Sequence, residues 1–339
     1  MTYPLPPAGT PRLGLFLQVD RAPNVQSTYA EVLDLIVAAE QFGYHSARVT
    51  QHHFGERYGR LPSPLPLLVA AAERTRHIRL GTVVITITLE QPLRLAEDAA
   101  VTDLLINGRL ELGLGSGFAP DVFAAFGVDI EHRRPLTTAS FTCLQRALAG
   151  EPLDDQDTRL QPPAPDLLNR LWLAVMSQEG ATYAAQHQMG LLLGRVERGG
   201  GSPVANQTLT VNTYRSALGA QAANARIGVG RAVYPANDRA TAKRDLAEAL
   251  AQSTKEHVKR GLLSADASLD EVLTRFHILH GHPEEIGATL AAEQAALGWS
   301  ELLVQIDPGD LPHHKALRAL ERVAQEVAPY LTAPALAIA

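Results

Sequence analysis

Eight short apolar segments recur along the chain, and each is followed by a stretch with helical periodicity. They are residues 13–19, 46–50, 78–86, 110–114, 171–175, 191–193, 226–234 and 302–306. Because these segments are apolar throughout and do not alternate, they are typical of parallel strands buried on both faces. Eight β–α units in 339 residues predict a (β/α)8 TIM barrel with insertions, formed by a single domain over residues 1–339.

A doubly wound sheet is the main alternative fold. It would be favoured by a nucleotide fingerprint after the first strand, but residues 17–23 contain no glycine. Ser27 or Thr28 is predicted to cap the first helix, and Asp238 a long later one. Residues 253–281 have a less regular pattern. Further helices are predicted over residues 66–76, 93–107, 133–148, 180–188, 203–218, 283–297 and 315–328.

Composition excludes several classes of protein. Net charge is −6, and no block of five like charges occurs, so nucleic acid and membrane surfaces are not expected partners. The single cysteine, Cys143, excludes an internal disulfide and a multi-cysteine metal site. No apolar run reaches the length of a membrane span, and the first residues lack the pattern of a secretory signal. A cytoplasmic enzyme is therefore expected.

The glycine-rich segment 112–118, LGLGSGF, invites a dinucleotide-binding interpretation. A G-x-G-x-x-G fingerprint would need glycine at Phe118 or at Pro120, so the motif fails at both. Two interpretations stay open. The small residues let backbone N–H groups approach an anion, or they only relieve crowding where the strand leaves the barrel.

Two adjacent histidines, His52 and His53, come directly after the second predicted strand. In a barrel this position faces the active-site mouth, where an imidazole can transfer a proton near neutral pH. A shared metal is poorly supported, because adjacent side chains of an extended segment point to opposite sides. The alternative is that one imidazole packs under a loop and the other faces solvent.

A second group of histidines, His277, His280 and His282, lies in the less regular segment. The spacing H-x-x-H-x-H resembles a ligand cluster, but it lacks the helical H-E-x-x-H arrangement of zinc hydrolases. A metal hydrolase barrel is therefore kept only as an alternative, and no metal ligand is assigned.

Several motifs in order make the chain recognisable. They are QHHF, LGTVVITIT with QPLRLAED, NGRLELGLGSGF, FGVD, LAVMSQEGATYAA, GHPEEI and DPGDLPHHKALRAL. In this order and spacing the chain resembles the bacterial-luciferase-like, flavin-dependent monooxygenases over about residues 12–330. The resemblance implies a TIM barrel that binds reduced FMN at its mouth, where the flavin reacts with O2 to form a C4a-peroxide.

The resemblance also implies roles for residues near the flavin ring. His52 is the expected catalytic histidine, with His53 assisting it. The family motif is E-H-H-F, so Gln51 replaces a glutamate and removes a negative charge near the flavin. Val83 and Val84 match a strand bulge, often with a non-prolyl cis peptide, that supports the ring. A plain buried strand is the alternative for these two valines.

The flavin phosphate is expected at the ends of the fourth and fifth strands. Ser116, Gly117 and Phe118 match the first of these segments, and Ser177 and Gly180 the second, where a helix N-terminus favours an anion. Many relatives have arginine in place of Ser116. Arg195 and Arg231 are therefore candidates for the missing cation, and Met176 removes a glutamate found in luciferase.

These implications predict a two-component monooxygenase that oxygenates a small organic substrate. Reduced FMN would come from a separate NAD(P)H:flavin reductase, because the chain has no nicotinamide fingerprint. Residues 253–282 are the candidate lid, and a homodimer is expected. The alternatives are an F420-dependent hydride-transfer enzyme of the same fold and a flavin-binding protein without turnover.

Overall fold

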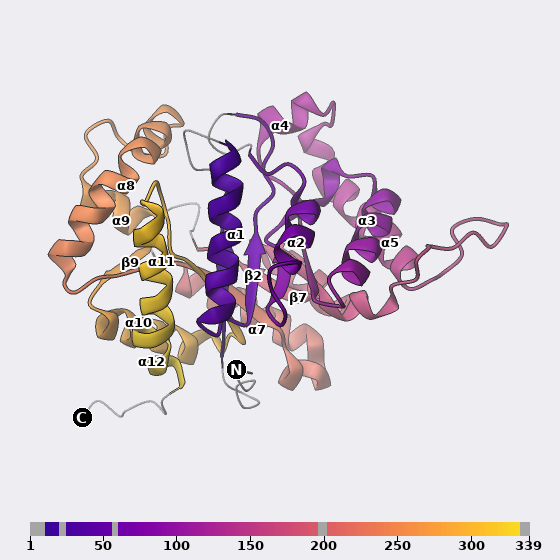
Figure 1. Cartoon of the computed structure of the whole chain (residues 1–339). Helices are drawn as coiled ribbons and strands as arrows, with labels where there is room; N and C mark the ends of the chain where they lie inside the picture. The colour runs from indigo at the N-terminus through magenta and orange to yellow at the C-terminus, as the bar shows by residue number, and fades with distance from the viewer. Residues whose placement is uncertain (1–10, 20–24, 56–59, 196–201, 333–339) are drawn as a thin grey trace.

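The computed structural model describes residues 11–19, 25–55, 60–195 and 202–332, and its strands form a closed parallel barrel (Figure 1). The barrel closes because β10 pairs with both β1 and β8. This confirms the predicted (β/α)8 architecture. The strands of the barrel are β1 (Arg12–Leu17), β2 (Ser46–Val49), β3 (Arg79–Thr82), β5 (Leu110–Gly115), β6 (Leu171–Val175), β7 (Gly190–Leu193), β8 (Ile227–Pro235) and β10 (Glu301–Gln305).

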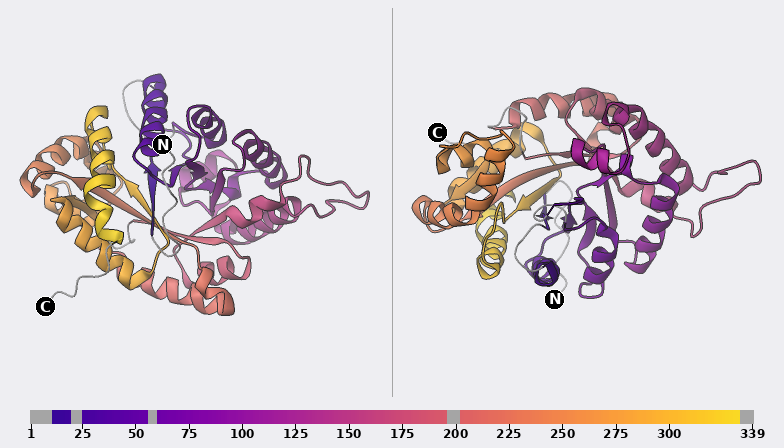
Figure 2. Two further views of the ribbon diagram at one scale, coloured as in Figure 1. Left: turned by 60° about the horizontal axis from the view of Figure 1, so that its bottom comes forward. Right: turned by 90° about the horizontal axis from the view of Figure 1, so that it is seen from above.

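Helices surround the strands, as the view from above shows (Figure 2, right). They are α1 (Val25–Gln41), α2 (Pro64–Ala72), α3 (Pro92–Leu105), α5 (Arg133–Leu148), α6 (Gln178–Gln186), α7 (Val204–Leu218), α10 (Pro283–Leu297) and α11 (His313–Arg322). Asp238 caps α8 (Arg239–Lys259) as predicted, since the Thr241 N–H donates to its carboxylate at 2.6 Å. The cap predicted at Ser27 or Thr28 is wrong, because α1 already begins at Val25.

The predicted third strand is interrupted. β3 ends at Thr82, a short β4 (Ile85–Thr86) resumes the direction, and the Val83–Val84 peptide between them is cis. The expected bulge is therefore present. Gly115 of β5 lies against it, since a Cβ at Gly115 would stand 2.6 Å from Val84 Cγ2.

An insertion follows β8 and differs from the sequence prediction. The segment predicted to be irregular contains the end of α8 (Arg239–Lys259), then α9 (Leu269–Arg275) and a strand, β9 (Ile278–Gly281). β9 pairs in parallel with residues 232–235 of β8, outside the barrel ring. In Figure 1 this insertion forms the orange side of the molecule.

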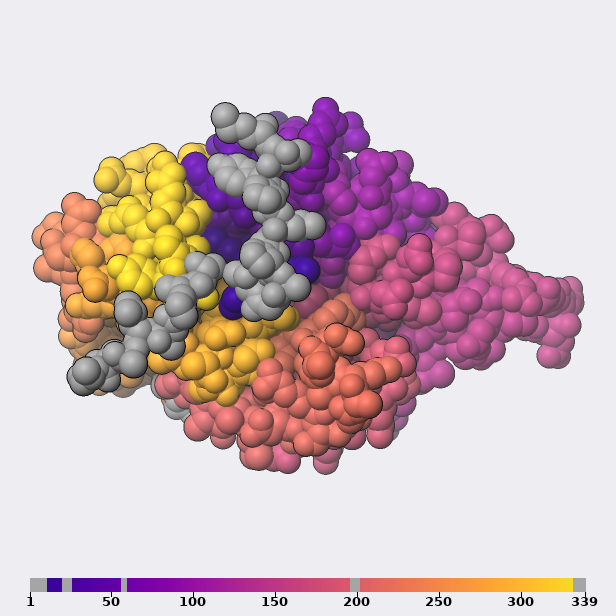
Figure 3. Space-filling model, turned by 90° about the horizontal axis from the view of Figure 1, so that it is seen from below, coloured from indigo at the N-terminus to yellow at the C-terminus, as the bar shows by residue number. Residues whose placement is uncertain are grey.

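The final predicted helix, 315–328, is also divided. α11 ends at Arg322, a π-helical turn spans Val323–Val327, and α12 (Pro329–Thr332) follows. On the opposite side of the molecule, the connector that follows α5 projects away from the barrel. This projection is visible in Figure 1 and from below in Figure 3. Within the described residues, no helix is long and apolar enough to cross a lipid bilayer.

The main hydrophobic core lies between the strands and the surrounding helices. Inside the barrel, a smaller apolar cluster of Trp172, Leu192 and Leu303 carries four partly buried side chains: Phe16, Val83, Val84 and Ala174.

A buried ionic group lies in the same barrel interior. Arg48 pairs with Glu301 at 2.6 Å and stands 4.3 Å from the Trp172 ring centroid. Glu111 lies 3.9 Å from Arg48 and also pairs with Arg79. Burial alone would raise the pKa of Glu111, but Arg48 and Arg79 outweigh it, so the pKa is lowered and the carboxylate stays charged.

Candidate active site at the barrel mouth

The residues predicted to form the site lie at one end of the barrel. Each group follows the carboxyl end of a strand, and in a parallel barrel these ends meet at the same rim. The groups are Gln51 to His53 after β2, Val83–Val84 after β3, Ser116 to Phe118 after β5, Ser177 and Gly180 after β6, and Arg195 after β7. Figure 2 (right) looks down on this rim.

His52 is partly buried at the mouth, and its backbone N–H donates to the Leu61 carbonyl at 3.1 Å. Burial, then the neighbouring His53 and the Arg260 charge, lower the pKa of His52 to about 4. Its imidazole is therefore neutral near pH 7, with one nitrogen able to accept a proton and the other able to donate one.

His53 packs in an aromatic cluster. Its ring lies edge-on to Phe126, with centroids 4.9 Å apart, and 6.1 Å from the Phe54 ring. Burial lowers the pKa of His53, and the charge of Glu90 partly opposes that effect. The Nε2 atom is buried and makes no hydrogen bond to any of the residues that the structure describes. The alternative in which one histidine simply faces solvent therefore does not describe this pair.

Gln51 is only 5% exposed, and its carboxamide binds three separate groups. The Thr86 N–H donates to Oε1 at 2.7 Å. Nε2 donates to the Pro62 carbonyl at 3.1 Å and to Glu90 Oε1 at 2.7 Å. The side chain thereby connects β2 to the segment that follows the Val83–Val84 peptide.

The floor of the mouth is apolar. Phe16, Val83, Val84 and Ala174 cover the interior cluster at this end. Beside them, Gln305 Nε2 donates to Gln18 Oε1 at 2.9 Å, while Gln305 Oε1 is buried and has no hydrogen-bond partner in the described parts of the chain. An apolar floor with one unsatisfied polar atom fits the isoalloxazine ring of a flavin, which is flat and carries ring N–H groups.

The ends of β5 and β6 offer donors to an anion. Gly117 has φ of 72°, and Arg133 Nη1 donates to its carbonyl at 3.3 Å. Ser177 caps α6, accepting the Gly180 N–H at 3.2 Å, so its hydroxyl proton remains available. The first N–H groups of α6 have no partner within the helix apart from this cap, so they are further donors for an anion.

Arg133 was missed by the sequence analysis. Among described residues it has no carboxylate partner, whereas its neighbour Arg134 lies 3.5 Å from Glu179. The signal was present, because two arginines open the helix predicted over 133–148. Only the fold shows that this helix start lies beside Gly117.

The two arginines proposed from sequence behave differently. Arg195 is at the rim, where Nη1 donates to the Phe276 carbonyl at 3.2 Å. Arg231 as a phosphate ligand is wrong. It belongs to β8, but its side chain is fully buried against the outer helices, paired with Glu293 of α10 and bound to Gln207 of α7 at 2.8 Å.

The second histidine group does not converge. His277 Nε2 lies 3.0 Å from Glu293 Oε1, His280 Nδ1 lies 2.9 Å from the Ile278 carbonyl, and His282 accepts the Glu284 N–H at 3.4 Å. No group of three potential ligands for a metal occurs in the part of the chain that the structure describes.

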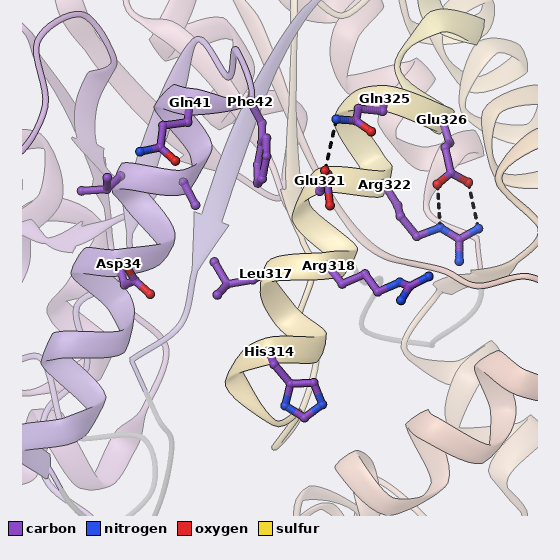
Figure 4. A pocket seen from close by; sticks show the side chains of 12 residues that line it. Asp34, Gln41, Phe42, His314, Leu317, Arg318, Glu321, Arg322, Gln325 and Glu326 are labelled. Carbon is purple, nitrogen blue, oxygen red and sulfur yellow. Dashed lines mark hydrogen bonds and ion pairs between the residues drawn. The ribbon is translucent and has the colours of Figure 1, made fainter.

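A groove of about 590 Å³ lies elsewhere, between α1 and α11 on the outer wall (Figure 4). Phe42 and Leu317 lie in it, and Arg322 pairs with Glu326 at 2.8 Å. None of the predicted site residues lines this groove. We therefore place the functional site at the barrel mouth.

A closed parallel barrel with its polar groups at the strand ends defines the class of (β/α)8-barrel enzymes. Within that class, the chain belongs to the luciferase-like monooxygenase family, whose model matches residues 12–300. The 4-hydroxyprotoasukamycin monooxygenase of Streptomyces nodosus subsp. asukaensis is 29% identical over 322 residues, which cover 88% of this chain and 85% of that protein.

Solved structures share the fold over almost the whole chain. Monooxygenase RslO1 from Streptomyces bottropensis has a TM-score of 0.80 at 25% identity and covers 94% of this chain and 99% of its own. The oxygenating constituent of 3,6-diketocamphane monooxygenase from Pseudomonas putida, in complex with FMN, has a TM-score of 0.76 at 18% identity, covering 96% and 100%. An F420-dependent secondary alcohol dehydrogenase also shares the fold, with a TM-score of 0.73 at 13% identity, covering 95% and 99%.

Proposed function

We propose that this protein is a monooxygenase that uses reduced FMN and O2 to oxygenate an organic substrate. The observation that carries the proposal is the apolar floor at the mouth, with the neutral imidazole of His52 beside it. The reduced flavin would supply the electrons that activate O2. The floor excludes water, and His52 holds or accepts a proton at its ring nitrogen.

The FMN phosphate is assigned to the ends of β5 and β6. Ser116, Gly117 and Phe118 and the α6 N-terminus with Ser177 and Gly180 supply neutral donors. Arg133 supplies the positive charge that Ser116 cannot, because its guanidinium lies beside Gly117 without a carboxylate partner among described residues. Gln51, Val83 and Val84 would position and support the ring, and Arg195, which follows β7 at the same rim, would line the cofactor site.

An apolar substrate fits the rim. Large apolar side chains are exposed at the ends of the strands: Phe54 at 57%, Phe118 at 72% and Met176 at 69%, with Phe126 at 42% directly after helix α4 (Pro120–Ala125). Exposed apolar groups gathered at a site mark a ligand surface. The substrate class we infer is an apolar organic molecule that covers these side chains.

Partners follow from the same proposal. Reduced FMN would be delivered by a separate NAD(P)H:flavin reductase, and residues 253–282 would cover the mouth. We also infer a homodimer formed by a single-domain chain. On α3, Val101, Leu104 and Leu105 are 45%, 60% and 57% exposed and share one helix face, which a second copy would bury.

An anaerobic titration tests the cofactor. Reduced FMN should bind with a saturable change in flavin absorbance, and O2 admitted afterwards should be consumed with an apolar substrate present. Tight binding of F420 and no binding of reduced FMN would favour the alternative hydride-transfer enzyme, whose fold the F420-dependent dehydrogenase shares. Flavin retained without O2 consumption across a substrate screen would indicate a binding protein without turnover.

A further inference from the structure

Gln51 has contacts that only a carboxamide can make. The Thr86 N–H requires an acceptor from residue 51, whereas the Pro62 carbonyl and the Glu90 carboxylate each require a donor. A glutamate at position 51 would satisfy Thr86 and leave the other two without a donor. The glutamine side chain therefore provides the N–H donor that the Glu90 carboxylate needs.

Glu90 enters this site from another part of the chain. It follows the 3-10 turn η1 (Ile87–Leu89), and its backbone N–H donates to the Ile87 carbonyl at 3.3 Å. The side chain is partly buried, and Gln51 Nε2 donates to it at 2.7 Å. A carboxylate held by an amide donor in a partly buried position keeps a fixed orientation.

Of the two histidines, His53 is the one whose pKa the charge of Glu90 raises against the effect of burial. Among the described residues, the charged and titratable groups that act on His53 are Glu90, from the segment after η1, and His52, from its own segment. In the same part of the chain, the Phe54 and Phe126 rings also pack against it. The charge of Arg260, directly after α8, acts on His52 and lowers its pKa.

We propose that Glu90 is a positioning residue of the active site. Residue 51, a glutamine, brings no negative charge to the segment that carries His52 and His53. Glu90 supplies that charge instead, and the hydrogen bond from Gln51 holds its carboxylate in place. The charge acts on His53 and through it on the neighbouring His52. This inference deepens the proposed function by naming a further residue of the same site, and it can be tested without a flavin.

The decisive experiment follows the histidine ring protons of the cofactor-free protein by NMR as pH is varied. Glu90→Gln keeps an oxygen that accepts from Gln51 but removes the charge. The titration midpoint of His53 should fall by about half a pH unit or more. Glu97→Gln is the matched control, because Glu97 is an exposed carboxylate on α3 that pairs with Arg94 at 3.1 Å. It should leave His53 unchanged.

An unchanged His53 midpoint in Glu90→Gln would overturn the proposal, and so would an equal shift in Glu97→Gln. If the midpoint falls as expected while reduced FMN fails to bind the wild type, the proposed function fails and the role of Glu90 stands. If FMN binds and the midpoint does not move, the proposed function stands and this inference fails.

A charge swap provides the second readout. Gln51→Glu places two carboxyl groups within hydrogen-bond distance, so it should lower the melting temperature at pH 7. The double variant Gln51→Glu with Glu90→Gln restores a donor facing an acceptor and should recover part of that loss. A double variant no more stable than Gln51→Glu would show that the two side chains are not coupled, and would overturn the pairing.

Discussion

At the scale of single residues, His52 is the side chain on which the proposed chemistry depends. Because its pKa is about 4, the imidazole stays neutral across the physiological range, and its role is to accept or relay a proton. His52→Ala should lower product formation by about 100-fold or more. FMN affinity and circular dichroism should change little. Product yield equal to wild type would remove His52 from the reaction.

The phosphate assignment gives a second residue-scale prediction. Ser177→Asp should weaken FMN binding, because a carboxylate at the α6 N-terminus repels the phosphate. Arg133→Gln should weaken it about 10-fold or more, the value of one charge-assisted hydrogen bond. Arg146→Gln is the matched control, since Arg146 lies near the other end of α5 and pairs with the exposed Glu151 at 3.1 Å. Isothermal titration of all three variants with FMN would separate these effects, and equal affinities would place the phosphate elsewhere.

At this scale, the sequence could predict the place of a residue only where that residue directly follows a predicted strand. His52, Ser177 and the Val83–Val84 peptide follow strands that the apolar pattern predicts, so the sequence could place them at the same end of the barrel. Arg133 and Glu90 were not found, because each reaches its partner across a loop, at Gly117 and Gln51. Arg231 was placed wrongly because sequence periodicity does not reveal which face of a fully buried strand a residue occupies.

At the scale of elements, the glycines of β5 serve packing. A Cβ at Gly113 would stand 2.1 Å from the Thr82 carbonyl oxygen, so the crowding interpretation of this segment is correct for Gly113. Gly113→Ala should therefore destabilise the protein by about 1–3 kcal/mol or more, since the backbone of β3 must move. Gly127→Ala controls for the residue change, because nothing lies within 4 Å of its Cβ position, although its φ of 68° carries a separate cost. Urea unfolding would measure both.

Element boundaries were predictable where the local pattern agreed with the fold. α10 and α5 begin and end where their sequences predict. β9 was missed, because ILHG is short, includes a histidine and pairs only with the extension of β8 beyond the barrel. β9 belongs to the insertion and not to the barrel ring, and its own sequence gives no strand signal. The eight apolar segments were therefore sufficient to predict the barrel.

At the scale of the whole molecule, the exposed face of α3 predicts self-association. Leu104 is 60% exposed beside Val101 and Leu105, and none of the three contributes to the main core. Leu104→Arg should convert a dimer to a monomer in light scattering, without lowering the helical signal. Leu209→Arg is the matched control, because Leu209 is a similarly exposed leucine, at 52%, on α7. A wild-type monomer would contradict the proposed dimer.

The stability of the whole fold should also depend on two histidines at opposite ends of β2. Burial lowers the pKa of both His45 and His52 to about 4, against an ordinary value of 6.5 that applies to the unfolded chain. For His45, the nearby charge of Glu301 opposes this effect only in part. Between pH 6.5 and 4 the unfolded chain therefore binds more protons than the folded protein.

The free energy of unfolding must consequently fall as pH falls through this window, by up to about 1.4 kcal/mol per pH unit for each histidine. Urea unfolding at pH 7 and at pH 4.5 should show this loss, and His45→Gln should reduce it, because glutamine can face Arg12 without titrating. His132→Gln, at a side chain that is 71% exposed, should leave the loss unchanged. Carboxylates titrate near the lower limit in all three proteins, so the difference between the two variants isolates the buried imidazole. The same loss in His45→Gln as in wild type would mean that His45 takes up its proton equally well in the folded and unfolded chains.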